Sequence, residues 1–322
     1  MATGIETLGL PRYLAYFTFA PLWETFFGEL GVTTIPSPPT NMGILDDGVK
    51  DTVNDACIPI KIFHGHVMAL RDQVDAIFIP RLACYDGEAT FCPKFLGLPD
   101  MVRHSCADLP TIIAPRLDVR RRGQDLKHFL YRVGHQVTGN GRNLRRAYLK
   151  AINAFTEQKE RWQQEGLAAF GFQEPKDTRV QLGLLGYPYM LYDRFASGGL
   201  IDKLHELGVR LETPDTLSDE AMKAGETDLV QNMFWYYSNR AVWAGLHFLK
   251  RPDIDGLIHV TAFGCGPDAM VDKVLELECK QHDVSFMSLT IDELTGDAGL
   301  STRLEAFVDM LVSRKRGGRQ CD

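Results

Sequence analysis

The chain has 322 residues and a mass of 36.2 kDa, with 45% hydrophobic and 24% charged residues. This is the composition of a folded globular protein, and it excludes a disordered or low-complexity chain. The 35 Lys and Arg against 42 Asp and Glu give a net charge of −7, which argues against binding to nucleic acid or to an anionic membrane surface. The expected partner is a small molecule or another protein.

The sequence also indicates where the protein is located and what its cysteines do. No stretch is apolar enough for a membrane helix, and the first residues lack the pattern of a secretion signal, so we expect a cytoplasmic protein. The cysteines are odd in number and widely dispersed, unlike the dense framework of a small secreted domain. In a reducing compartment they are core residues, nucleophiles or metal ligands. They are Cys57, Cys84, Cys92, Cys106, Cys265, Cys279 and Cys321.

Short β-branched runs alternate with segments of helical periodicity in the first part of the chain. The order strand, helix, strand predicts parallel βαβ units, and the length of the chain allows two domains. We therefore expect an N-terminal α/β lobe over residues 1–118. Its predicted strands are 6–10, 31–36, 74–80 and 110–115, and its predicted helices are 12–29 and 46–72.

The rest of the chain predicts a helical connector over 119–176 and a C-terminal α/β lobe over 177–322. The fold class is thus α/β, with two doubly wound lobes. Ligands of such sheets bind beyond the carboxyl ends of the strands, so the candidate site residues are expected there. The predicted strands of the second lobe are 179–186, 208–212, 256–262 and 284–290, and its predicted helices are 198–207, 228–249, 267–281 and 301–314.

Cys265 has the most informative surroundings of any cysteine. It lies in the segment FGCGPD, directly after a predicted strand and before a predicted helix. The flanking glycines allow a sharp turn, and the start of a helix favours a thiolate. A tight turn that merely accommodates a cysteine is the alternative.

Cys57 and Cys92 also stand beside proline, in DACIP and FCPK. Proline fixes the chain next to the sulfur and is found beside cysteines that hold clusters. Three soft thiolates without C-x-x-C pairs favour an iron–sulfur cluster over zinc. Cys57, Cys92 and Cys265 are therefore the predicted ligands, with Cys84 as a candidate fourth ligand.

Three other features have both a functional and a structural interpretation. His64 and His66 follow Cys57 and could donate protons near a cluster, although buried core histidines are commoner. The aromatic residues of 187–192 could line a cleft or pack against the sheet edge. The basic run that begins at Arg116 could form a solvated helix face or dock an acidic electron donor or CoA phosphates.

Seven ordered segments give the chain a resemblance that extends from Leu8 to about Leu311. It resembles the acyl-CoA dehydratase activase-related proteins, relatives of the 2-hydroxyacyl-CoA dehydratase subunits and of the double-cubane cluster proteins. The segments are LGLPRYLAYFTFAPLWETFFGELG, DACIPIKIFHGHV, DAIFIPRL, FCPKFLGLPDM, GLLGYPYMLYD, FGCGPDAM and IDELTGDAGLSTRLEAFVDML.

The resemblance implies flavodoxin-like lobes and a 4Fe-4S cluster between them, held by Cys57, Cys92 and Cys265. It implies ATP-dependent, low-potential electron transfer or reductive chemistry in an anaerobic setting, with an acyl-CoA-like or other small-molecule substrate. The chain has no G-x-x-x-x-G-K-[ST] motif, so a separate ATP-hydrolysing activase is the expected partner. A homologous subunit or a second copy could contribute thiolates to a larger bridged cluster.

Whether the chain is itself an enzyme stays open at this point. A cluster with an open iron favours a dehydratase or reductase, and a complete set of four cysteines favours a non-catalytic electron-relay or scaffold subunit. A third hypothesis is an α/β binding protein without a cluster.

Overall fold

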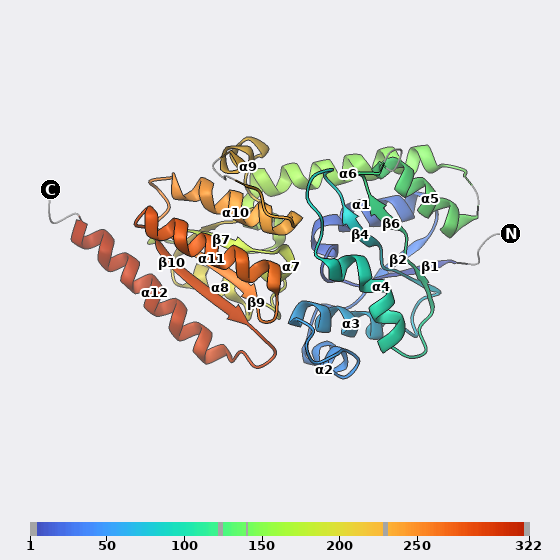
Figure 1. The fold of residues 1–322 in the computed structure, drawn as a ribbon, viewed down its shortest axis with the longest axis horizontal. Helices are drawn as coiled ribbons and strands as arrows, with labels where there is room; N and C mark the ends of the chain where they lie inside the picture. The colour runs from blue at the N-terminus through green and yellow to red at the C-terminus, as the bar shows by residue number, and fades with distance from the viewer. Residues whose placement is uncertain (1–4, 122–124, 140, 228–230, 319–322) are drawn as a thin grey trace. The chain divides into compact units, whose positions relative to one another are not determined.

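The computed structural model describes residues 5–121, 125–139, 141–227 and 231–318 (Figure 1). Within these residues it contains twelve α-helices and ten strands, and the strands of each sheet pair in parallel. The α/β class predicted from the sequence is therefore confirmed. The chain divides into two compact units, unit 1 (Met1–Lys159 with Phe234–Tyr236) and unit 2 (Glu160–Met233 with Tyr237–Asp322).

Unit 1 is built on a four-stranded parallel sheet with the strand order β2-β1-β3-β5. All four strands were predicted from the sequence. Their bounds are β1 Thr7–Leu10, β2 Thr33–Pro36, β3 Ala76–Phe78 and β5 Thr111–Ile113. The chain passes from β1 outward to β2 and then returns to β3, so the direction of winding reverses between β1 and β3. In a parallel sheet this is where a ligand binds.

Two strands of unit 1 were missed by the sequence analysis, because proline interrupts them. After β3 the chain continues through Pro80 into β4 (Arg81–Cys84), and after β5 it continues through Pro115 into β6 (Arg116–Asp118). β4 and β6 pair in parallel as a separate two-stranded sheet. Proline has no N–H to donate to the ladder, so the pair is broken at the same point in both strands.

The predicted helix 46–72 is wrong as a single element. The structure has α2 (Met42–Lys50) and α3 (Ile58–Leu70), separated by a loop. Asn41 caps α2, since its side chain accepts a hydrogen bond from the Ile44 N–H at 3.2 Å. Pro59 lies in the first turn of α3, where its missing N–H does no harm.

Glycine allows α2 and α3 to pack with their backbones in contact. A Cβ on Gly48 would lie 1.9 Å from the carbonyl oxygen of Lys61, and a Cβ on Gly65 would lie 1.8 Å from that of Ile44. Neither position can therefore carry a side chain at this spacing. The two glycines fix the position of α3, the helix that begins directly after Cys57.

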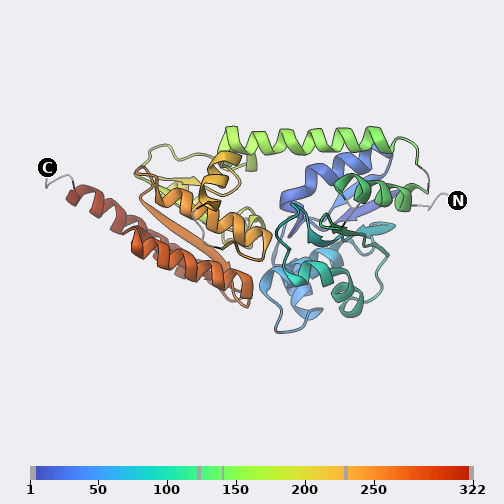
Figure 2. The same cartoon turned by 45° about the horizontal axis from the view of Figure 1, so that its top comes forward.

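Aromatic residues fill the core of unit 1. Phe19 stacks on Phe155, and Trp23 packs edge-on against Phe78. The remaining helices of this unit are α1 (Tyr16–Glu29), α4 (Pro93–Ser105) and α5 (Leu126–Thr138), and the long helix α6 (Leu144–Glu165) begins in it. Figure 2 shows α6 as one uninterrupted helix, and the unit boundary at Lys159 falls within it.

Unit 2 has a second four-stranded parallel sheet with the strand order β10-β9-β7-β8. All four strands were predicted. They are β7 Val180–Gly186, β8 Val209–Glu212, β9 Gly256–Ala262 and β10 Ser285–Ile291. β9 is buried along its whole length because it is central and covered on both faces. The winding reverses between β7 and β9.

The helices of unit 2 enclose a core that includes Leu185, Phe248, Leu257 and Leu275. They are η1 Gly166–Phe170, α7 Pro188–Leu191, α8 Leu200–Glu206, α9 Asp219–Glu226, α10 Tyr236–Leu249, α11 Gly266–Gln281 and α12 Asp297–Gly318. None of the helices in the described ranges is both long and apolar enough to cross a membrane. The predicted division into 1–118, 119–176 and 177–322 stays a prediction.

Candidate functional site

The three cysteines predicted as ligands share one local structure. Each is the N-cap residue of a helix, and proline occupies the first or second helical position: Cys57 precedes α3, Cys92 precedes α4 and Cys265 precedes α11. The N-cap is where the unpaired N–H groups and the helix dipole favour a negative charge. Each of the three cysteines therefore stands at the positive end of a helix dipole.

Cys57 and Cys92 lie close together within unit 1. Burial raises the pKa of the Cys92 thiol, the backbone N–H of Lys94 opposes this by donating to its sulfur, and the nearby Cys57 raises it further. The side chain of Lys94 reaches the other sulfur, with its Nζ 3.5 Å from the Sγ of Cys57. A single residue thus acts on both thiols, through its backbone N–H at Cys92 and through its ammonium group at Cys57.

Cys265 belongs to unit 2 and follows β9, one of the two strands between which the winding reverses. The N–H of Cys265 donates to the carbonyl oxygen of Ala262 at 3.1 Å and closes a four-residue turn. Gly264 is the third residue of this turn and has φ +77°, as a type II turn requires. The glycine before Cys265 is therefore explained by backbone geometry.

The other described cysteines have different surroundings. Cys84 ends β4 and its thiol contacts the carboxylate of Asp86 at 3.6 Å. Burial raises the pKa of Cys106 to about 11 and that of Cys279 to about 12. These two thiols stay protonated at neutral pH and pack as apolar side chains. Cys321 lies outside the described residues.

No group of three or more His, Cys, Asp or Glu side chains within the described residues is arranged to hold a metal ion. The sulfurs of Cys57 and Cys92, which lie close together beside Lys94, fit part of a thiolate ligand set. The remaining predicted ligand is in the other unit.

His64 and His66 are both fully buried in α3. The Nδ1 of His64 donates to the carbonyl of Ile60, while the two ring nitrogens of His66 bond to the hydroxyls of Ser37 and Thr40. Burial lowers the pKa of His66 to about 3. A neutral ring held by two hydroxyls ties α3 to the segment after β2, and it is a poor proton donor at neutral pH.

The aromatic segment after β7 is packed inside unit 2. Tyr187 and Tyr189 are 5% and 4% exposed, and both rings contact Tyr237. The hydroxyl of Tyr187 is 2.8 Å from that of Ser238. These contacts favour the structural interpretation of this segment.

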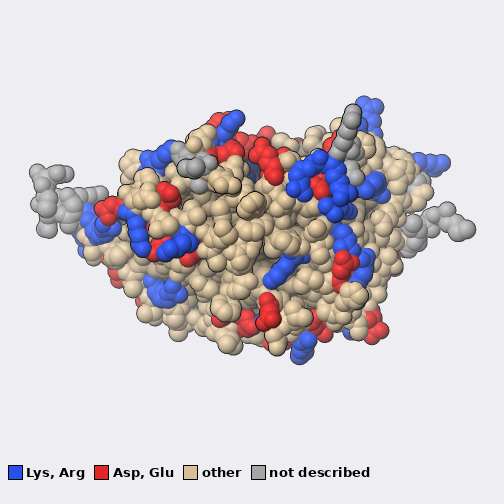
Figure 3. Space-filling view, in the orientation of Figure 1, with Lys and Arg blue, Asp and Glu red and all other residues tan. Residues whose placement is uncertain are grey.

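The first part of the basic run does not lie on a helix. Arg116, Arg120 and Arg121 all form ion pairs with one buried carboxylate, Asp118 at the end of β6. Burial raises the pKa of Asp118, but the arginines outweigh this effect and hold it below its usual value. On the face shown in Figure 3, basic side chains lie among acidic ones.

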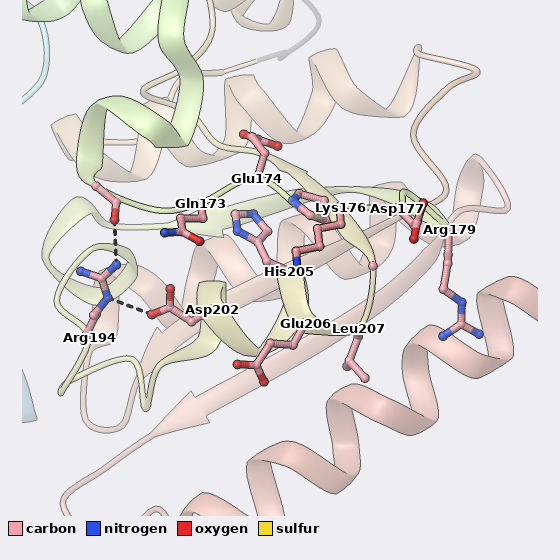
Figure 4. A pocket seen from close by; sticks show the side chains of 13 residues that line it. Gln173, Glu174, Lys176, Asp177, Arg179, Arg194, Asp202, His205, Glu206 and Leu207 are labelled. Carbon is pink, nitrogen blue, oxygen red and sulfur yellow. Dashed lines mark hydrogen bonds and ion pairs between the residues drawn. The ribbon is translucent and has the colours of Figure 1, made fainter.

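A pocket of about 670 Å³ lies at the amino ends of the unit 2 strands (Figure 4). Cys265, by contrast, follows the carboxyl end of β9. Arg179 and Gly208, which line it, directly precede β7 and β8. Arg194 is held in its wall by Asp202 and by the carbonyl of Gly171. This pocket was not predicted from the sequence, because ligand sites are expected at the carboxyl ends of the strands and its residues lie at the amino ends. Its acidic and basic side chains nearly balance, so its charge selects no single class of ligand.

Comparison with known families agrees with the resemblance in its broad outline. Residues 7–217 match the model of the family described as CoA enzyme activase uncharacterised domain. The match covers more than half of the chain, and the chain belongs to this family. Cys57 and Cys92 lie within the matched residues, and Cys265 lies beyond them. A search of curated proteins found no match.

Proposed function

We propose that this chain is an iron–sulfur protein of the 2-hydroxyacyl-CoA dehydratase superfamily that works with a separate ATP-hydrolysing activase. Cys57 and Cys92 of unit 1 and Cys265 of unit 2 hold a 4Fe-4S cluster. The chain takes part in ATP-dependent low-potential electron transfer or reductive chemistry. Membership of the CoA enzyme activase family supports the link to an activase.

The observation that carries this proposal is the pair of thiols at Cys57 and Cys92. Both are helix N-caps beside proline, and Lys94 lies beside both: its ammonium group contacts the Cys57 sulfur, and its backbone N–H lowers the pKa of Cys92. Hydrogen bonds and positive charge near ligand sulfurs stabilise thiolates and tune the reduction potential of a cluster. Cys265 shares the N-cap position beside proline, whereas Cys84, Cys106 and Cys279 do not.

The strand orders support the flavodoxin-like part of the proposal. Numbered along each unit, both sheets have the order 2-1-3-4, which is the order of the first four strands in a flavodoxin-like sheet. Cys265 follows the third of these strands in unit 2, beside the point where the winding reverses. In unit 1, Cys57 and Cys92 lie on the segments that follow the second and third strands.

A cubane held by three thiolates would supply one-electron chemistry and leave one iron open to an exogenous ligand. The residues of this chain bind and orient it: the helix N-termini favour the thiolates, and Lys94 adds a positive charge beside Cys57. The open iron favours catalysis over a simple electron relay. Cys84 supports the same choice, because burial and, to a smaller extent, the facing Asp86 carboxylate raise the pKa of its thiol and disfavour a thiolate there.

Iron and acid-labile sulfide per chain, with EPR of the dithionite-reduced protein, test this proposal after anaerobic purification. We expect about four irons per chain and a cubane signal that responds to added ligands. Cys57→Ser, Cys92→Ser and Cys265→Ser should each lower the iron content, whereas the matched control Cys106→Ser should not. A protein that binds no iron after anaerobic reconstitution would overturn the proposal.

A further inference from the structure

A buried ionic cluster joins β9 to the first turns of α11, the helix that begins directly after Cys265. His259 of β9 is fully buried and stands between two carboxylates of α11. Its Nε2 is 3.1 Å from Asp268, which is also fully buried, and its Nδ1 is 2.8 Å from Asp272. Asp268 and Asp272 are one helical turn apart and therefore face the same strand.

Both ring nitrogens face carboxylate oxygens, and these only accept hydrogen bonds. The two bonds can form together only if the ring carries both protons. Burial alone lowers the pKa of His259, but Asp268 and Asp272 outweigh it and raise the pKa to about 9. Other groups around the ring act on Asp272, where the Ser288 hydroxyl donates and Lys273 adds a nearby positive charge. The ring is an imidazolium at neutral pH.

The Asp268 carboxylate also reaches the strand end. Its second oxygen accepts the N–H of Ala262 in a long hydrogen bond of 3.4 Å. Ala262 is the first residue of the turn that Cys265 closes, and Asp268 is the third helical residue after the Cys265 N-cap. One carboxylate therefore links the strand side of the turn to its helix side. The imidazolium compensates the charge that this buried carboxylate brings.

We propose that His259 and Asp268 are positioning residues for Cys265, which tie the first turn of α11 to the end of β9 and so fix the direction of the thiol. Asp272 stabilises the imidazolium through the Nδ1 of His259 but makes no bond to the turn. The role in holding a cluster rests on the proposed function. The positioning itself is a property of the metal-free chain.

Hydrogen exchange of the reduced, metal-free full-length protein tests the inference. In Asp268→Asn we expect the Ala262 and Cys265 amides to exchange at least tenfold faster, while amides of β7 and β10 keep their rates. Asp272→Asn is the matched control, since it removes one carboxylate of the cluster and leaves the bond to the turn. Its Ala262 and Cys265 amides should exchange as in the wild type. Equal acceleration in both variants, or none in Asp268→Asn, would overturn the inference.

Two wild-type measurements keep the test valid if Asp268→Asn fails to fold. The Ala262 amide should exchange as slowly as the Val260 amide, and nitrogen NMR should show both ring nitrogens of His259 protonated at pH 7. A rapidly exchanging Ala262 amide or a neutral ring would contradict the positioning role. None of these readouts requires iron. The positioning role can therefore be confirmed in a chain that binds no cluster, and it can be contradicted in a chain that binds one.

Discussion

Lys94 places its ammonium nitrogen 3.5 Å from the sulfur of Cys57, although the two residues are 37 positions apart in the chain. The contact joins the starts of α3 and α4. It shows why the short motif Cys-Pro-Lys is informative: the proline starts the helix, and the lysine turns back toward a second thiol. An ammonium group at this distance is close enough to attract a negative charge that forms on the Cys57 sulfur during a reaction.

Removal of this charge should slow the reaction of Cys57 with iodoacetamide. For Lys94→Met we expect a rate about fivefold lower at pH 7, as an interaction of roughly 1 kcal/mol predicts. Peptide mass spectrometry would measure the rate, with Cys265 of unit 2 as the internal reference. Lys94→Arg keeps the charge and should react close to the wild-type rate, and an unchanged rate in Lys94→Met would contradict the role of the ammonium group.

The N-cap positions of the three cysteines predict an unusual tolerance of serine. Serine is a better N-cap than cysteine, so Cys57→Ser, Cys92→Ser and Cys265→Ser should keep or raise the stability of the metal-free protein by up to about 1 kcal/mol. Cys279→Ser, which buries a hydroxyl inside α11, should lose about 1–3 kcal/mol. Urea unfolding curves would separate the two groups, and a loss at the N-cap positions as large as that at Cys279 would contradict their assignment.

His259 predicts a loss of stability at alkaline pH. Its pKa is about 9 in the folded protein against about 6.5 when unfolded, so the folded state binds more protons between these values. This contribution is complete below pH 6.5 and is lost as the pH rises through 9, with a total of about 3 kcal/mol. Unfolding free energies from pH 6 to 9.5 would show the decline. His259→Gln should be less stable than the wild type at pH 6 and should lack this part of the decline. Parallel pH profiles of the two proteins would refute the role of His259.

The glycine contacts between α2 and α3 predict a large effect of a single methyl group. Gly48→Ala and Gly65→Ala should each destabilise the protein by about 3 kcal/mol, because the new Cβ would overlap a backbone carbonyl that cannot move away. Gly97→Ala in α4 is the control. It has open space around its Cβ and should gain about 0.5–1 kcal/mol. Thermal unfolding distinguishes these outcomes, and similar stabilities of the three variants would argue against the close approach.

The eight strands of the two large sheets could be predicted because each lies in a short apolar or β-branched run with turn residues beside it. The parallel pairing followed from the order of the elements. β4 and β6 could not be predicted, since each follows a proline that ends the preceding run, and the pairing of Arg81 with Arg116 becomes visible only when the two strands are aligned. The repeated segments IPRL and APRL, at residues 79–82 and 114–117, were the available signal.

The candidate site was predictable in part for a similar reason. Cys265 could be placed at a turn because a strand ends just before it and glycine flanks it. Cys57 was placed late in the helical stretch that starts near Asp46, since the apolar spacing runs across the loop that separates α2 from α3. The helix after Cys92 was missed altogether, because two prolines and a glycine weaken its helical pattern. The partners of His259 lie on the next helix, and the spacing of charges alone does not identify them.

The segment Phe234–Tyr236 has a consequence for synthesis on the ribosome. It belongs to unit 1, where the Phe234 carbonyl accepts the Thr90 N–H at 2.9 Å and Tyr236 donates back to Thr90 at 2.8 Å. Unit 1 therefore lacks these contacts until about 75 residues beyond Lys159 have been translated, which takes roughly 4 to 15 seconds. During that interval the N–H and carbonyl of Thr90 lack these two partners, and the loop between Cys84 and Cys92 keeps its own antiparallel bridge between Cys84 and Thr90. A nascent chain arrested at Lys159 should expose this loop to proteases, whereas the finished protein protects it.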